Sequence, residues 1–167
     1  MLTRESERYI TDHREFFARF LAPKGDHLFT CSAGVGSGCV NAYGQLQLCM
    51  LLRHPETLYD LENGCLHDAL TGFFPAVRER YATNPDYLRR CARCFLRGFC
   101  EQCPAKSWME HGTLDTPVDY LCEVAHAQAR YLGILKAGEY AWEISDWRDR
   151  VEAFIADAAL ESRLAER

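Results

Sequence analysis

Apolar side chains recur every three or four residues in several segments of the chain, and this spacing predicts amphipathic helices. The segments are residues 4–21, 66–81, 117–138 and a last one that begins near Ser145. Pro75 interrupts the second segment, so this helix should kink there or give way to another helix. A capping residue stands before a proline at Asn84-Pro85 and at Thr116-Pro117. Both pairs predict helix starts, the first for a short helix that leads into Cys91.

A different pattern, strict alternation, occurs in one short part of the chain. Leu46, Leu48 and Met50 alternate with more polar residues, which predicts a strand over 45–50. It should pair with residues 40–42 through a turn at Tyr43-Gly44. The preceding segment, 31–39, carries three glycines and predicts a loop that wraps closely around a ligand, and residues 54–63 read as turns. The expected fold class is therefore α+β, a small, mainly helical domain with a short β-hairpin.

Composition and charge limit the classes of partner. The chain has 167 residues and a net charge of −5, from 19 Lys and Arg against 24 Asp and Glu, so nucleic acid is not an expected partner. No run of 18 apolar residues is present, and the first 20 residues carry charges throughout. We therefore expect no membrane partner and no signal peptide, and a cytoplasmic location.

Nine cysteines are the most informative part of the composition. Their odd number and the missing export signal argue against a disulfide framework. In a reducing cytoplasm, clustered thiols indicate metal binding or catalysis. The densest cluster comprises two C-x2-C pairs, Cys91 with Cys94 and Cys100 with Cys103. Such pairs bind zinc or iron–sulfur clusters, or act as redox dithiols, and the last use is disfavoured because no βαβ pattern surrounds them.

Counting ligands leaves two metal hypotheses open. One tetrahedral zinc would use Cys91, Cys94, Cys100 and Cys103 and would leave five cysteines without a role. Two four-thiolate sites would need eight cysteines, which are present when Cys122 is included and Cys65 is left out. Cys65 precedes an apolar helical pattern, so we expect it to be a small buried residue. The remaining candidates lie in the loop and hairpin: Cys31, Cys39 and Cys49.

The order and spacing of these cysteines resemble a known family. Cys31-x12-Gly44-x4-Cys49, a gap, Cys91-x2-Cys94-x5-Cys100-x2-Cys103 and then Cys122 are similar to the SPASM domain. This domain is the auxiliary-cluster extension of many radical S-adenosylmethionine enzymes that mature peptides and proteins. The pair Cys100-x2-Cys103 is one residue shorter than the C-x3-C of the family's signature.

The resemblance implies two [4Fe-4S] clusters with interleaved ligands. Cys31, Cys39, Cys49 and Cys103 would bind the first cluster. Cys91, Cys94, Cys100 and Cys122 would bind the second. Because these ligands are distant in sequence, cluster binding should be coupled to folding. The implied organisation is an N-terminal helix and linker (1–30), a twin-cluster domain (31–122) and C-terminal helices packed on it (123–167).

The radical chemistry itself is not expected from this chain. The sequence contains no C-x3-C-x2-C motif and no barrel-like alternation of strands and helices. S-adenosylmethionine would therefore be bound by a missing or separate domain. The chain is expected to be a piece of a larger enzyme, a split subunit or a free-standing module.

Two function classes follow. In the first, the chain is an auxiliary-cluster domain that serves electron transfer and substrate positioning, with a radical S-adenosylmethionine domain in cis or trans, a peptide or protein substrate and a redox protein as partners. In the second, it is a non-enzymatic zinc module for protein interaction. Arg53, Arg89, Arg90 and Arg97 are candidates to meet an acidic partner, although a solvated face explains them more simply. His126 lies four residues after Cys122, on the same helix face, and is a candidate to support that ligand.

Overall fold

The computed structural model describes the backbone of residues 16 and 18–165 and the side chains as far as residue 156. Most of the helix predicted for 4–21 lies outside the described residues. The chain divides into two compact units, each built from separate segments. The central unit comprises Gly25–Ala92 and Gln102–Asp119, and the terminal unit comprises Met1–Lys24, Arg93–Glu101 and Tyr120–Arg167. The predicted cluster-bound domain over 31–122 stays a prediction.

A three-stranded antiparallel sheet forms one layer of the central unit. Strands β1 (Cys39–Val40) and β2 (Gln45–Gln47) make the predicted hairpin, with Val40 opposite Leu46. Its turn is stabilised by Asn41, whose Oδ1 accepts hydrogen bonds from two backbone N–H groups, and by Gly44 at φ +73°. The sequence did not indicate β3 (Leu58–Asp60), which pairs with β2, because three residues are too few to show alternation.

A broken helical run follows the sheet in sequence. It consists of α3 (Leu66–Asp68), a π-helical turn η2 (Ala69–Phe73) and α4 (Phe74–Arg78). The wide turn is closed by the Phe74 N–H, which donates to the Ala69 carbonyl. Pro75 therefore lies in the first turn of α4, where a missing N–H leaves no hydrogen bond unmade. The predicted interruption at Pro75 is confirmed, although the helix ends before residue 81.

Two further helices complete the central unit, together with the 3₁₀ turn η1 (Pro55–Thr57). Helix α5 (Pro85–Arg89) begins as predicted, because Asn84 accepts a hydrogen bond of 2.9 Å from the Asp86 N–H. Helix α6 (Pro104–His111) was not predicted. Its signals are present in the sequence: a proline at its first position and Gly112, at φ +68°, just after its end.

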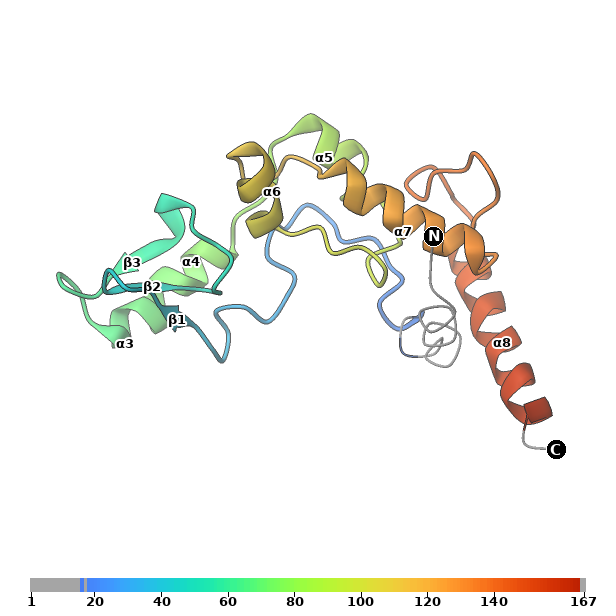
Figure 1. Ribbon diagram of the computed structural model, residues 1–167, viewed down its shortest axis with the longest axis horizontal. Helices are drawn as coiled ribbons and strands as arrows, with labels where there is room; N and C mark the ends of the chain where they lie inside the picture. Colours follow the sequence, from blue (N-terminus) through green and yellow to red (C-terminus); the bar gives the residue numbers. More distant parts are fainter. Residues whose placement is uncertain (1–15, 17, 166–167) are drawn as a thin grey trace. The chain divides into compact units, whose positions relative to one another are not determined.

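The core of the central unit lies between the sheet and the helical run. Figure 1 shows α4 beside the strands, and Leu46, Leu48 and Phe74 are buried between them. The glycine-rich loop packs onto this core. A Cβ on Gly34 would lie 2.8 Å from Leu48 Cγ, and one on Gly38 would lie 3.1 Å from the Gln47 carbonyl oxygen. Close packing, rather than contact with a ligand, therefore accounts for two of the three glycines.

The terminal unit contains α7 (Asp119–Tyr131, of which the first residue belongs to the central unit) and α8 (Trp147–Ala165). Helix α7 is shorter than predicted. It ends before Gly133, at φ +74°, and the Ile134 N–H then bonds to the Ala129 carbonyl at 2.9 Å. This turn buries Ile134 and Leu135 in the core with Phe95, Ala129 and other apolar residues. The predicted start of the last helix near Ser145 is confirmed.

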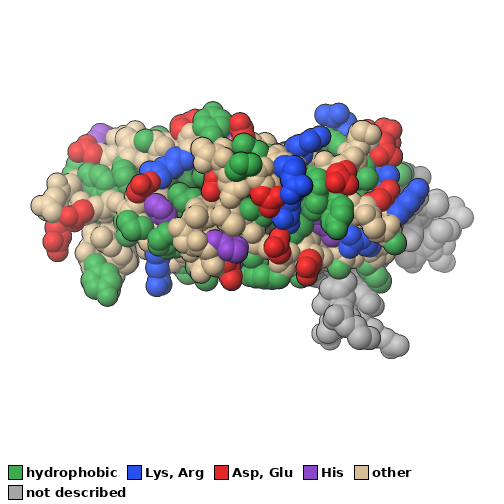
Figure 2. Space-filling model, turned by 90° about the horizontal axis from the view of Figure 1, so that it is seen from above, with side chains coloured by type: hydrophobic (Ala, Val, Ile, Leu, Met, Phe, Trp, Pro, Cys, Tyr) green, Lys and Arg blue, Asp and Glu red, His purple; other side chains and the backbone are tan. Residues whose placement is uncertain are grey.

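The fold is thus α+β, with helices and an antiparallel sheet, as the sequence pattern indicated. In the described part of the chain, every helix is too short or too polar to cross a bilayer. Acidic and basic side chains are interspersed on the face shown in Figure 2. This surface shows no extended tract of one sign of charge.

Candidate metal centre

All nine cysteines lie among the described residues, and none forms a disulfide. Cys31 and Cys65 are exposed, and the others are partly buried. Cys49, Cys91 and Cys103 pack against the core of the central unit, whereas Cys94 and Cys100 pack against the core of the terminal unit. Most of the thiols therefore lie at the edges of the two cores, where a metal centre would also support packing.

The two units divide the candidate ligands. The central unit contains Cys31, Cys39, Cys49 and Cys103, together with Cys65 and Cys91. The terminal unit contains Cys94, Cys100 and Cys122. Cys100 and Cys103, the two members of one C-x2-C pair, consequently fall in different units. Cys91 lies in the central unit, two residues before Arg93, at which the chain enters the terminal unit.

Cys39 and Cys49 are brought together by the hairpin. Cys39 is the first residue of β1 and lies opposite Gln47, two residues before Cys49. Its Sγ lies 4.0 Å from the Gln47 carbonyl oxygen. Burial raises the pKa of the Cys39 thiol, and the negative charge of Cys49 raises this pKa further. The two thiols therefore interact electrostatically.

Arg78 anchors the loop that carries Cys31. Its guanidinium donates to the Ala33 carbonyl and, at 3.5 Å, to the Phe29 carbonyl, on either side of Cys31. A helix of the core thus supports an exposed cysteine through the backbone of its loop. Nothing in the sequence around Arg78 indicates this role.

The two C-x2-C pairs differ in backbone conformation. Residues 91–93 form a turn, and the Ala92 N–H donates to the Tyr87 carbonyl at 2.9 Å. Residues 100–103 form no turn, and Cys103, at φ −150° and ψ 164°, is the extended N-cap residue of α6. The first pair therefore begins in a turn, whereas the start of α6 extends the chain at the second pair.

Cys122 is accompanied by a buried histidine. His126, with 3% of its surface exposed, places Nδ1 at 2.8 Å from the Cys122 carbonyl oxygen and 3.5 Å from its Sγ. The Nε2 atom accepts a hydrogen bond of 3.1 Å from the Ala141 N–H. The predicted proximity of His126 to Cys122 is confirmed.

Cys65 does not have the predicted burial. It is exposed and is the N-cap residue of α3, where its Sγ lies 3.5 Å from the Asp68 backbone N–H. The prediction was wrong because the apolar pattern begins one residue later, and Leu66 is itself half exposed.

The thiols are not assembled into a complete site. Among the residues that the structure describes, no three His, Cys, Asp or Glu side chains converge to hold a metal ion. A metal centre made from these residues would therefore require the cysteine-bearing loops to close around it.

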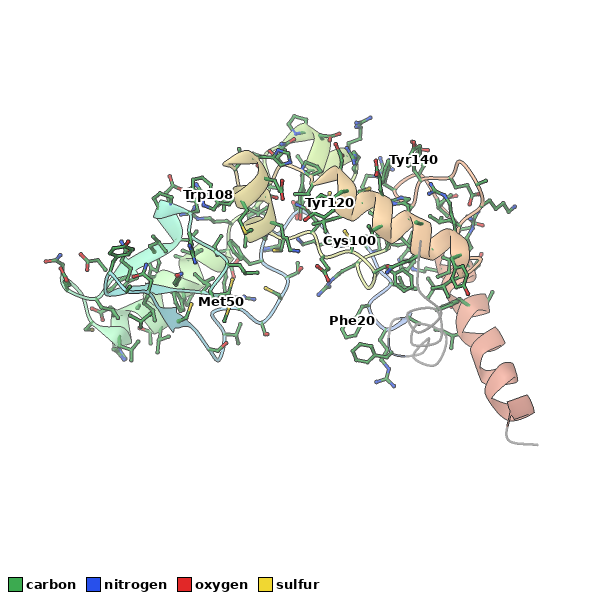
Figure 3. All side chains as sticks on the ribbon, in the orientation of Figure 1. Phe20, Met50, Cys100, Trp108, Tyr120 and Tyr140 are labelled. Atoms are coloured by element: carbon green, nitrogen blue, oxygen red, sulfur yellow. The ribbon has the colours of Figure 1, made fainter. Side chains whose placement is uncertain are left out.

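An apolar hollow of about 240 Å³ lies elsewhere in the central unit. Met50 and Leu51, after β2, and Trp108 and Met109, on α6, line it together with Arg53; Figure 3 labels Met50 and Trp108. Met50 and Met109 are exposed, at 72% and 62%. The candidate cations Arg89 and Arg90 form ion pairs, both with Asp86.

We compared the chain with protein-family models, with curated proteins and with solved structures, and none of the three comparisons finds a match.

Proposed function

We propose that this chain is an auxiliary iron–sulfur domain of a radical S-adenosylmethionine enzyme that modifies a peptide or protein. Cys31, Cys39, Cys49 and Cys103 would bind one [4Fe-4S] cluster, and Cys91, Cys94, Cys100 and Cys122 would bind the other. Electron transfer and substrate positioning are its proposed roles.

The observation that carries the proposal is the assignment of the cysteines to the two units. The first ligand set lies wholly in the central unit, and three of the second set lie in the terminal unit. The division separates Cys103 from Cys100 despite their closeness in sequence, and it groups Cys122 with Cys94 and Cys100. This grouping depends only on backbone contacts, so it is independent support for interleaved ligands.

The donor chemistry also fits iron–sulfur clusters. Thiolates are the usual ligands of [4Fe-4S] clusters, and all eight proposed ligands are free of disulfides. Cys39 and Cys49 lie on one hairpin, and the charge of Cys49 raises the pKa of the Cys39 thiol in addition to the effect of burial. Since the loops must close to complete either site, cluster binding should stabilise the fold as it forms.

A single zinc on the four closely spaced cysteines is less well supported. Such a site needs Cys103 beside Cys94 and Cys100, usually through a tight turn in each C-x2-C pair. In contrast to residues 91–93, residues 100–103 form no turn. Zinc bound by other groupings of the cysteines is the alternative that metal analysis must address.

The electron-transfer role follows from the ligand count. When bound, the clusters would supply one-electron redox chemistry. Four cysteines for each cluster leave no iron open to substrate, which favours electron transfer over direct substrate ligation. The net charge of −5 should lower the reduction potentials, because it disfavours adding an electron.

Substrate positioning is supported by the apolar hollow in the central unit. Exposed methionines adapt to varied apolar side chains, and a neighbouring tryptophan supplies rigid contact area. Arg53, at the same hollow, has a charge suited to a carboxylate. A peptide with a bulky apolar residue next to an acidic one therefore fits this surface.

Anaerobic reconstitution with ferrous iron and sulfide tests the proposal. We expect about eight irons and eight sulfides per chain, and no cleavage of S-adenosylmethionine by this chain alone. One or two zinc ions without sulfide, in protein purified without oxygen, would contradict it. Aerobic preparations would mislead, because exposed clusters degrade and zinc then takes their place.

A further inference from the structure

Helix α7 has apolar residues on two opposite faces. One face packs in the core of the terminal unit, where Ala125 and Ala129 are buried. The other face carries four exposed side chains, which we call the outer seam: Tyr120, Val124, Ala127 and Tyr131. Figure 3 labels Tyr120. At about 100° per residue the four lie within an arc of about 60°, so they form one continuous stripe along the helix.

The spacing within the outer seam is that of a helix–helix contact. Single exposed apolar residues are common, but intervals of four, three and four residues follow the heptad pattern by which one helix packs on another. The two tyrosines and Val124 are each about half exposed, at 49%, 52% and 51%. Val124 and Ala127, the smaller residues, lie in the middle and let a second helix approach closely. The tyrosines lie at the ends, where their rings can be buried while their hydroxyl groups stay in water.

The charges beside the outer seam indicate which helix fits it. Glu123 and Arg130 lie on the same flank of the stripe, one toward each end of the helix, whereas Gln128 lies on the other flank. The Arg130 Nη2 donates to the Glu139 carbonyl at 3.2 Å, which holds the guanidinium in place. When two α7 helices pack antiparallel, like flanks meet, so Glu123 of each copy faces Arg130 of the other. The two residues are then offset by about 3 Å along the axis, a distance that an arginine side chain spans.

We propose that two copies of the chain associate through the outer seam, with their α7 helices antiparallel about a two-fold axis. Tyr120 of each copy then lies against Tyr131 of the other. A two-fold axis forms every contact twice and closes the assembly at two copies. A parallel pair is disfavoured, because it sets Glu123 opposite the flank that carries Gln128, where no opposite charge meets it. Because no cysteine belongs to the outer seam, the association does not depend on bound metal.

Sedimentation equilibrium of the full chain, kept reduced to prevent disulfide cross-links, tests the association. One helix face per copy is a small interface, so we expect a weak monomer–dimer equilibrium in samples of up to about 0.5 mM. Val124→Glu should weaken it about a hundredfold or more, because an unpaired charge is then buried twice in the symmetric dimer. Val35→Glu is the matched control, since Val35 is also exposed, at 69%, but lies in the glycine-rich loop of the central unit. This control should leave the association unchanged.

Two measurements test the antiparallel orientation. Glu123→Arg should weaken the association about tenfold, because two ion pairs become two repulsive contacts, and Glu123→Arg/Arg130→Glu should restore it. Circular dichroism shows whether each variant keeps the fold of the monomer. Without any substitution, nuclear Overhauser contacts in a mixture of isotope-labelled and unlabelled chain should join Tyr120 of one copy to Tyr131 of the other.

Three results would overturn the inference. The first is a monomer at every concentration, which would leave the outer seam to another domain or protein. The second is equal weakening by Val124→Glu and Val35→Glu. The third is contact between Tyr120 of one copy and Tyr120 of the other, which would show a parallel pair.

Discussion

Cys100 and Cys103 offer the sharpest test of how the cysteines are shared. They are separated by only two residues, yet they belong to different compact units. We predict that Cys100→Ala and Cys103→Ala remove different clusters. Each variant should lose about four of about eight irons, and the double variant should lose nearly all of them.

Two cysteines that are assigned to the same cluster provide a matched control with the opposite expected result. Cys49 and Cys103 both pack on the core of the central unit and are assigned to the same cluster. The double variant Cys49→Ala/Cys103→Ala should therefore retain about four irons, no fewer than either single variant. Iron and sulfide are counted after anaerobic reconstitution, and the visible absorption of each variant reports the cluster type.

Loss of iron through unfolding must be separated from loss of a ligand. Cys103 makes no side-chain capping hydrogen bond at the start of α6, and it is only partly buried. Replacing it with alanine should thus cost the metal-free protein only about 1 kcal/mol of unfolding free energy, roughly the value of one buried methylene. Urea unfolding of the metal-free variants checks this value.

The result that would refute this reasoning is non-additivity between Cys100 and Cys103. If both residues bind one metal, the double variant loses no more metal than either single variant. That outcome would restore the single four-cysteine site and would remove the support that the two units give to interleaved ligands.

Three further predictions concern the fold and the unassigned cysteine. Hydrogen bonds from Arg150 lower the pKa of Glu139 from 4.5 to about 2. This carboxylate therefore stabilises the terminal unit fully above pH 4.5, and its contribution is lost as the pH falls toward 2. Glu139→Gln should lower the midpoint of urea unfolding at pH 7 but not near pH 2. Gly34→Ala should destabilise the central unit by about 2 kcal/mol, since it combines positive φ with a 2.8 Å clash, whereas Gly36→Ala, with no atom within 4 Å, should be nearly neutral by thermal unfolding. Cys65→Ala should keep the full iron content, whereas Cys94→Ala should lose most of one cluster; equal losses would show that the ligand assignment is wrong.

Local signals predicted much of the secondary structure. Asn84 and the proline after it were sufficient to predict α5, because a side-chain cap and a fixed φ act within a few residues. Alternation predicted the hairpin for the same reason. The π turn before Pro75 was not predicted, since widening a helix depends on how its flanking residues pack. The end of α7 was missed because Leu135 keeps the helical spacing while lying beyond the helix.

The candidate site was likewise predicted only in part from the sequence. Cysteine spacing by itself predicted thiolate-bound metal, because thiol chemistry and the reach of a C-x2-C pair are local properties. Only the tertiary structure decided that Cys103 and Cys100 belong to different compact units, that Cys65 caps a helix and that Arg78 supports the Cys31 loop. These facts depend on contacts between residues far apart in sequence, and such contacts are determined by packing of the two cores rather than by any local pattern.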